Sequence, residues 1–244
     1  MRILALDTTT RGGSVALVHD DVVVEERPGD AARTHAERLP GEILALLAAH
    51  RLASCDVDVF AVASGPGSFT GLRIGIATIQ GLAFACARPV VGVPALDALA
   101  HAGIASGRNA AAGTIVGVWM DAHRRDVFAS LYEVADAPLF AVERLSAVEE
   151  PTVGDPATTL ERWRRLRPLD HAMFIGDGAV AFAETITRQL PSARVVPAPL
   201  IAGVLGRLAG RAAARGETDD PAAIHPLYVR RPDAEAARDR RVAD

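Results

Sequence analysis

Apolar residues recur along this chain in two rhythms: short β-branched runs typical of strands, and longer stretches with helical spacing. In the first half the pattern predicts, in chain order, strands at 2–7, 13–20 and 22–27, a helix after Thr34, a buried strand at 57–65, a helix after Thr70, a strand at 89–94 and a helix at 95–102. Asp20 and Asp21 make a tight turn between the second and third strands. The first three strands are therefore expected to pair antiparallel.

The helix after Thr34 has a clear start signal. Thr34 and Glu37 have the spacing of a capping box, in which each residue satisfies the other's backbone amide. Pro40 lies inside the predicted helix and is expected to kink it or to shift its start. One face of the helix is apolar and carries Leu39, Ile43, Leu46 and Leu47.

The second half repeats the same order of elements. It predicts strands at 114–122, 126–134 and 139–145, a helix at 157–167, a strand running into the turn at 175–179, a helix at 180–190, a short strand near 193–197 and a helix at 199–216. Gly216 is a natural residue to end that last helix. In both halves an aspartate, Asp7 or Asp121, ends the first strand. We therefore predict an internal duplication.

Duplicated β-β-β-α-β-α units with mixed sheets favour an α/β protein of two lobes with a cleft between them, the architecture of the actin-like ATPase fold. We place the N-terminal lobe at 1–105 and the C-terminal lobe at 106–198. The glycine-rich segment 103–113 is the expected hinge. The helix at about 199–216 is expected to pack back on the N-terminal lobe, and 232–244 to form a frayed tail.

Composition narrows the possible chemistry. Half of the 244 residues are apolar and the formal net charge is -4, without the basic excess of a general nucleic-acid binder. None of the 26 basic residues is lysine, so neither a Schiff-base lysine nor a P-loop lysine is present. Cys55 and Cys86 are too few for a disulfide framework, which fits a reducing, cytoplasmic setting. The chain start does not resemble a signal peptide, and the uncharged stretch from Ile74 to Ala87 is too short to cross a membrane.

The stretch "SGPGSFTGLRIG" at 64–75 raises several alternatives. Its glycines are one residue too far apart for a dinucleotide fingerprint, and no acid ends the next strand. The spacing also departs from a P-loop and from a G-x-S-x-G nucleophile elbow. What remains is a turn that opens a helix, serving as a cap or an anion site.

The helix that follows is unusually rich in small residues. Gly71, Gly75, Thr78, Gly81 and Ala85 share one face, and a glycine within a helix costs about 1 kcal/mol relative to alanine. This ridge leaves room either for another part of the same lobe or for a helix of a second polypeptide. On the second alternative, Gly75→Leu is expected to block association and leave the lobe folded.

Several blocks resemble the TsaB family, also called YeaZ. They are the stretch at 64–75 with "GLAFACARPVVGVPALDALA", the opening "ILALDTTT", "HAERLPGEI", "MDAHRRDVFASLY" and the late "HPLYVRRP". The resemblance runs from Ile3 to about Pro232. It implies the actin-like fold and a non-catalytic subunit in the synthesis of threonylcarbamoyladenosine on tRNA.

The resemblance also implies partners. They are a TsaD-like catalytic subunit, a TsaE-like ATPase and tRNA held through the complex; alone, the chain is expected to form a homodimer. No cofactor is expected for this chain, and ATP only at the assembled complex. The expected docking residues, on the helices after Thr34 and Thr70, are Ile43, Leu46, Leu47, Gly71, Leu72, Gly75, Ile76 and Ile79.

The cleft offers a second hypothesis, a nucleotide-dependent enzyme; a peptidase is a third, weaker one. The candidate cleft residues, active or vestigial, are Asp7, Thr8, Thr9, Asp121, Gly176, Asp177 and Gly178. Arg124 and Arg125 are candidates to touch tRNA or a partner's acid. A TsaD-like catalyst holds a metal partly through two histidines four apart, whereas none of the seven histidines here has such a neighbour. We therefore expect neither a metal site nor catalytic residues.

Overall fold

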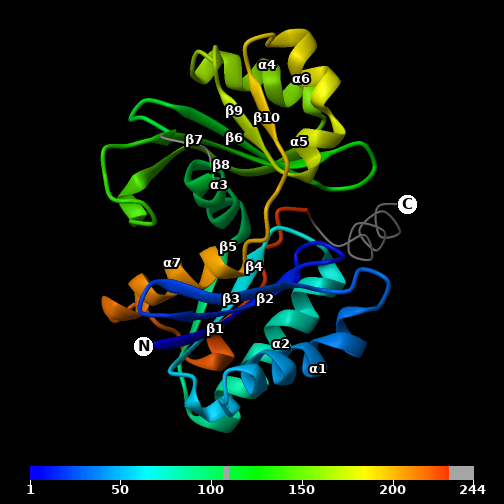
Figure 1. The fold of residues 1–244 in the computed structure, drawn as a ribbon. Helices are drawn as coiled ribbons and strands as arrows, with labels where there is room; N and C mark the ends of the chain where they lie inside the picture. The colour runs from blue at the N-terminus through cyan, green and yellow to red at the C-terminus, as the bar shows by residue number, and fades with distance from the viewer. Residues whose placement is uncertain (107–109, 231–244) are drawn as a thin grey trace, which may run out of the picture.

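Two five-stranded mixed sheets form the centres of two lobes (Figure 1). A computed structural model describes residues 1–106 and 110–230. The N-terminal lobe contains β1 (Arg2–Asp7), β2 (Ser14–His19), β3 (Val22–Pro28), α1 (His35–Ala49), η1 (Ser54–Asp56), β4 (Val59–Gly65), α2 (Phe69–Cys86), β5 (Val90–Pro94) and α3 (Ala95–Ser106). The frayed tail predicted at 232–244 lies outside the described residues.

The C-terminal lobe follows the same plan. Its elements are β6 (Ile115–Asp121), β7 (Val127–Val134), η2 (Val142–Arg144), β8 (Leu145–Gly154), α4 (Pro156–Leu166), β9 (Met173–Ile175), α5 (Asp177–Ala181), α6 (Ala183–Gln189) and β10 (Arg194–Val196). The chain then returns to the first lobe through α7 (Ala202–Ala214) and η3 (Pro221–Ala223).

The two sheets have the same topology. The strand orders β3-β2-β1-β4-β5 and β8-β7-β6-β9-β10 match position by position. In each sheet the first three strands of the chain pair antiparallel, and the next two add in parallel to the other side. The duplication predicted from the sequence is therefore confirmed.

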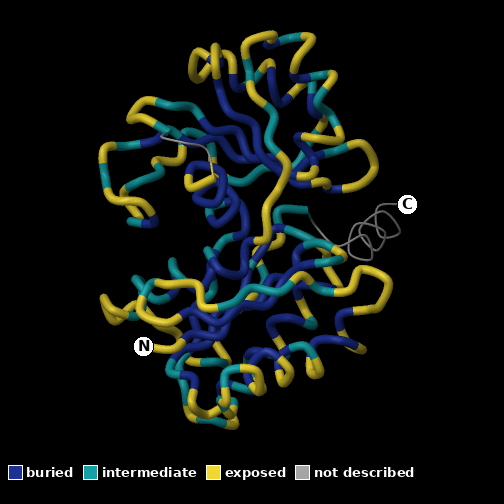
Figure 2. The backbone as a smooth tube through the Cα atoms, viewed as in Figure 1, coloured by how far each residue is buried: buried dark blue, intermediate teal, exposed yellow. Residues whose placement is uncertain are grey.

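Helices cover the sheets in layers. In the N-terminal lobe α1 and α2 lie on one face of the sheet, and α7 packs on the other, against β1 to β5. The helix α3 lies between the two sheets and contacts strands of both. One apolar core is continuous from the face under α7 through α3 to the second sheet. Figure 2 shows α3 and the neighbouring strands of both lobes coloured as buried. The lobes are therefore joined by packing as well as by the chain.

Side-chain caps mark the start of three of these helices. Thr34 and Glu37 form the expected capping box at the start of α1. The helix begins directly after Thr34 and runs through Pro40, so the proline does not shift its start. Ser68 caps α2, and Asp155 caps α4 with Pro156 in the first turn.

Several boundaries predicted from the sequence are wrong. The helix predicted at 180–190 is two short helices, α5 and α6, that meet at Phe182. The third strand of the second lobe is not at 139–145; β8 runs from Leu145 to Gly154. In β8, Glu149 accepts a hydrogen bond from the buried Trp163 indole at 2.6 Å and pairs with Arg162, so the acidic strand is anchored by α4. The predicted hinge at 103–113 also begins too early, because Gly103 to Ser106 continue α3. A Cβ on Gly103 would lie 2.7 Å from Ile175 of the other lobe, so this glycine allows α3 to approach the second sheet closely.

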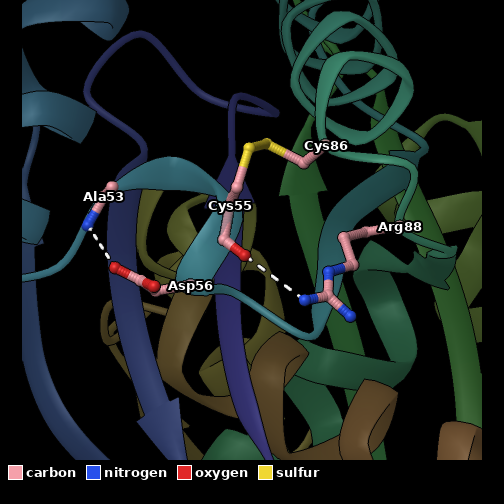
Figure 3. The surroundings of a disulfide bond; sticks show 5 residues. All are labelled: Ala53, Cys55, Asp56, Cys86 and Arg88. Carbon is pink, nitrogen blue, oxygen red and sulfur yellow. Dashed lines mark hydrogen bonds between the residues drawn. A yellow bond between two sulfur atoms is a disulfide. The ribbon is translucent and has the colours of Figure 1, made fainter.

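The two cysteines are bonded to each other, contrary to what the sequence suggested. Cys55 in η1 and Cys86 at the end of α2 form a disulfide, with their Cα atoms 4.9 Å apart (Figure 3). The two residues are 31 positions apart in the chain, and neither belongs to a C-x-x-C motif. Sequence spacing therefore gave no signal for the pair.

Candidate functional site

A cleft of about 1000 Å³ opens between the lobes. Its walls come from the β1–β2 loop, the turn before α2, the β6–β7 turn and the segment 227–230. Three of the seven predicted cleft residues line it, namely Thr9, Asp121 and Asp177. The fold therefore brings the ends of β1 and β6 to one cavity, as the duplication predicts.

Asp7 lies behind the cleft wall and is 5 % exposed. Its carboxylate accepts hydrogen bonds from the Thr9 backbone amide at 2.8 Å and from the Thr9 hydroxyl at 2.6 Å. Burial raises the pKa of Asp7, although the bonds from Thr9 act in the opposite direction. The Asp7 carboxylate therefore stabilises its own loop and is not exposed in the cleft, where a metal ion could reach it.

Thr8 points away from the cleft, toward α2. A Cβ on Gly75 would lie 2.2 Å from the Thr8 hydroxyl, and one on Gly71 would lie 2.2 Å from the Thr8 carbonyl oxygen. Thr8 is fully buried, and its hydroxyl has no hydrogen-bond partner within the described chain. The Thr8 side chain therefore packs against α2, and it is Thr9 and Thr10 of this loop that line the cleft.

The Gly176–Gly178 turn packs tightly on β6. A Cβ on Gly176 would lie 1.9 Å from the Trp119 carbonyl oxygen, and Gly176 has a positive φ of 129°. Asp177 accepts hydrogen bonds from the amides of Asp121 at 3.0 Å and Gly178 at 2.9 Å. The close packing of this turn on β6 accounts for both glycines. It agrees with the alternative in which they only form a turn and do not make room for a nucleotide. Among residues 1–106 and 110–230, no group of three metal-ligating side chains occurs.

Arg124 and Arg125 lie in the turn after β6, and both are exposed. Both adopt positive φ, 56° and 68° respectively. Arg124 lines the cleft, whereas Arg125 does not. The two predicted arginines therefore have different surroundings.

The segment after η3 is a part of the cleft that the sequence did not suggest. The Leu227 amide donates a hydrogen bond to the Ser64 carbonyl oxygen at 2.7 Å, and the centres of the Tyr228 and Phe69 rings lie 5.1 Å apart. Arg230 then donates to the Ala122 carbonyl at 2.6 Å and pairs with Asp126. This segment connects the turn before α2 to the β6–β7 turn, and so closes one side of the cleft across both lobes.

The eight predicted docking residues are buried inside their own lobe. The six apolar members of the set are each at most 4 % exposed. Five of them belong to the core under α1 and α2, and Leu72 packs next to Gly65. As described above, Gly71 and Gly75 approach Thr8. The argument that these two glycines leave room for a foreign helix is therefore wrong, and the alternative of a contact within the lobe is correct for them.

The opposite face of α1 and α2 is exposed and mostly apolar; its exposed charged residues are Glu37 in the first turn of α1 and Arg73 in α2, whose guanidinium lies 4.1 Å from the centre of the Phe69 ring. On α2, Phe84 is 83 % exposed, and a Cβ on Gly81 would have nothing within 4 Å. On α1, Leu44 is 61 % exposed. We call this surface the outer face; its exposed members are Pro40, Gly41, Leu44, Ala45, Ala48, Ala77, Gly81, Phe84 and Ala85.

The helix α2 is apolar on both sides. By length and composition alone it is the one described helix that would suffice to cross a membrane, although 33 % of that window is buried in the fold. The short length of the uncharged stretch from Ile74 to Ala87 therefore does not by itself exclude a membrane span. The helix lies on β4 beside α1, however, so it forms part of the lobe's core layer. A helix apolar all round is normally covered on every side, and α2 is covered on one side within this chain.

The matching sheets with a cleft between them define the class: this is a two-lobed protein of the actin-like ATPase fold. A family profile described as "TsaD: tRNA N6-adenosine threonylcarbamoyltransferase" matches residues 22–237. The chain belongs to the TsaB (YeaZ) family.

Individual relatives agree with this assignment. An uncharacterized protein of Mycobacterium tuberculosis is 36 % identical over 234 residues, covering 95 % of this chain and 93 % of the relative. The tRNA threonylcarbamoyladenosine biosynthesis protein TsaB of Bacillus subtilis is 28 % identical and covers 97 % of both chains. The solved structure of YeaZ from Pseudomonas aeruginosa is similar with a TM-score of 0.72 and 31 % identity, over 93 % of this chain and 99 % of that one.

Proposed function

We propose that this chain is a non-catalytic subunit of the complex that transfers a threonylcarbamoyl group to the adenosine beside the anticodon of tRNA. Family membership supports a role in threonylcarbamoyladenosine biosynthesis. The observation that carries the finer proposal is the outer face of α1 and α2, whose exposed residues between Pro40 and Ala48 and between Ala77 and Ala85 are apolar and uncharged. Surfaces of this kind are typical of protein interfaces.

The occupant we propose for the outer face is a TsaD-like catalytic subunit. This chain matches the TsaD profile over most of its length, so such a partner has related lobes. Two helices from each chain then form a four-helix seam, in which Gly81 and its alanine neighbours allow close approach and Phe84 is the large anchor. In the absence of the partner, the same face pairs two copies of this chain.

A scaffold role fits the state of the cleft. Asp7 is buried and hydrogen-bonded to its own loop, and no metal-ligating group of three occurs in the described ranges. We propose that the complex works in the cytoplasm, that a TsaE-like ATPase joins the assembled pair, that ATP acts only there, and that tRNA is held through the complex.

The direct test is reconstitution with the TsaD-like subunit of the same organism. We expect the purified chain to form a stable pair with it and to raise its rate of tRNA threonylcarbamoylation. Phe84→Asp is expected to weaken pairing by about a hundredfold and to reduce the rate increase accordingly, because it places a charge on the outer face. Leu166→Asp, which changes an exposed apolar residue of the second lobe, is the control and is expected to change neither. Normal pairing by the Phe84→Asp chain would contradict the proposal.

The cleft keeps a second candidate, a nucleotide-dependent enzyme, because a cavity of about 1000 Å³ is large enough for a nucleotide. Calorimetry of the isolated chain with ATP and magnesium separates the two functions. Tight binding by the isolated chain would favour the enzyme. For the third hypothesis, a peptidase, a digest of denatured protein with and without a chelator is expected to show no cleavage.

A further inference from the structure

The disulfide closes one end of the helix that carries the outer face. Cys86 is the last residue of α2, and Cys55 lies in the short η1 turn that leads toward β4 (Figure 3). The 31-residue separation encloses β4 and α2, so the bond ties the end of the helix to the start of its neighbouring strand. Beside it, Arg88 donates one hydrogen bond to the Cys55 carbonyl at 3.3 Å.

The bond is accessible to solutes. Cys55 is exposed and Cys86 is half-buried. Thiol–disulfide exchange requires a thiolate to approach one of the two sulfur atoms, so exposure at this position permits the reaction. Disulfides of cytoplasmic proteins are typically transient and redox-sensing, whereas structural ones belong to oxidising compartments.

The bond also lies next to the anchor of the outer face. Phe84 is two residues before Cys86 and in the same helical turn, and it is the most exposed large apolar side chain among the described residues. Beyond Cys86 the helix ends at Ala87 in a left-handed conformation, with φ of 52°. The covalent tie therefore holds the turn that presents Phe84.

We propose that Cys55 and Cys86 form a reversible redox site that controls docking at the outer face. The oxidant is a low-molecular-weight disulfide. The Cys55 or Cys86 thiolate attacks it, forms a mixed disulfide and releases one small thiol. The other cysteine then displaces the second small thiol, so two electrons pass to the small disulfide and the Cys55–Cys86 bond forms. No other cysteine occurs in the chain to divert the intermediate.

This inference rests on the proposed docking function and adds its regulation. In the oxidised chain the last turn of α2 is ordered before association. In the reduced chain that turn frays more readily, and association must order it again, which lowers affinity. Oxidation therefore strengthens the pair and reduction weakens it.

The test compares the full-length chain after treatment with oxidised glutathione and after full reduction, with free thiols counted by alkylation. Hydrogen exchange is measured at the amides of residues 83–88, and the dissociation constant is measured with the TsaD-like subunit. We expect exchange there to be about tenfold faster and pairing about fivefold weaker in the reduced chain. The double variant Cys55→Ser, Cys86→Ser is expected to match the reduced chain and to ignore both reagents, with unchanged circular dichroism.

Each alternative outcome is informative. Equal hydrogen exchange at residues 83–88 in the oxidised and reduced chains would overturn the proposed redox control. So would a measurable dissociation constant that is the same in both states. Either result would leave the docking function in place. Failure of oxidised glutathione to form the bond in the reduced chain would also overturn it. Absence of pairing in both states would instead remove the docking function, and the redox control with it.

Discussion

The two sides of α2 carry the same residue types for opposite reasons. On the inner side Gly71 and Gly75 lie so close to Thr8 that an added Cβ would lie 2.2 Å from an atom of that residue in each case. On the outer side Gly81 has no atom within 4 Å of the position that a Cβ would take. Inner glycines are therefore required by the lobe itself, whereas Gly81 is left without a contact in the single chain.

This difference separates stability from association. A change on the inner side acts on folding, because the neighbouring atoms belong to the same lobe and are buried. A change on the outer side leaves the fold alone and acts on whatever covers that face. Each of the following predictions tests one side of this comparison.

Gly75→Leu has the largest expected effect. The new side chain must displace the fully buried Thr8, so we expect the free energy of unfolding to fall by about 3 kcal/mol or more. Urea denaturation of the variant and of the wild type measures the change. Wild-type stability in Gly75→Leu would show that the inner contact is not as close as described.

Phe84→Asp should leave stability nearly unchanged and weaken association. A large, central aromatic anchor typically contributes about 2–3 kcal/mol to binding, close to a hundredfold in affinity. Isothermal titration with the TsaD-like subunit measures the loss, and the melting temperature checks the fold. A large fall in melting temperature without loss of affinity would show that Phe84 contributes to the fold, as the inner side of α2 does, and not to docking.

Acidification should act on the buried interior and spare the outer face. His101 in α3 is buried, and burial, followed by the nearby positive charges of Arg144 and Arg211, lowers its pKa from 6.5 to about 4. The unfolded chain therefore binds more protons between these values, so the contribution of neutral His101 is present above pH 6.5 and is lost as the pH falls toward 4.

At pH 5 this loss amounts to about 2 kcal/mol relative to pH 7. Unfolding free energies at the two pH values, for the wild type and for His101→Gln, isolate the contribution of this residue, because the variant should lack that part of the pH dependence. The outer face from Ala77 to Ala85 has no titratable side chain, so the same acidification should leave its own contacts unchanged. Identical pH dependence in the two chains would contradict the account of His101.

Gly81→Ala has the smallest expected effect and the opposite sign on stability. Because the site is open and lies within a helix, alanine should raise the free energy of unfolding by about 1 kcal/mol or slightly less. The same urea titration measures the gain. A destabilised Gly81→Ala chain would indicate a close neighbour at this position.

Much of the fold could be predicted from the sequence because strand and helix periods are local properties. The repeated order of elements, the Thr34–Glu37 capping box and the aspartates that end β1 and β6 all have local signals. The start of β8 was misplaced because residues 139–145 contain an apolar, strand-like run, whereas the acidic Glu149 of β8 has its partners on α4, which only the fold brings near. The disulfide joins residues 31 positions apart, and no local pattern announces such a contact.

The orientation of α1 and α2 could not be predicted for a different reason. Helical spacing separates two faces, but in α2 both faces are apolar or small, so the pattern does not say which one meets the sheet. The sequence therefore located both helices but assigned Ile76 and Ile79 to the surface, although both are buried. Only the packing distinguishes Gly75 from Gly81.

The most direct measurement is the affinity of Gly81→Leu for the TsaD-like subunit, with its unfolding free energy measured alongside. The account predicts a chain at least as stable as the wild type that binds its partner far more weakly, because the leucine fills the space that a partner helix needs. A stable Gly81→Leu chain that binds with wild-type affinity would contradict the claim that the outer face is the docking surface.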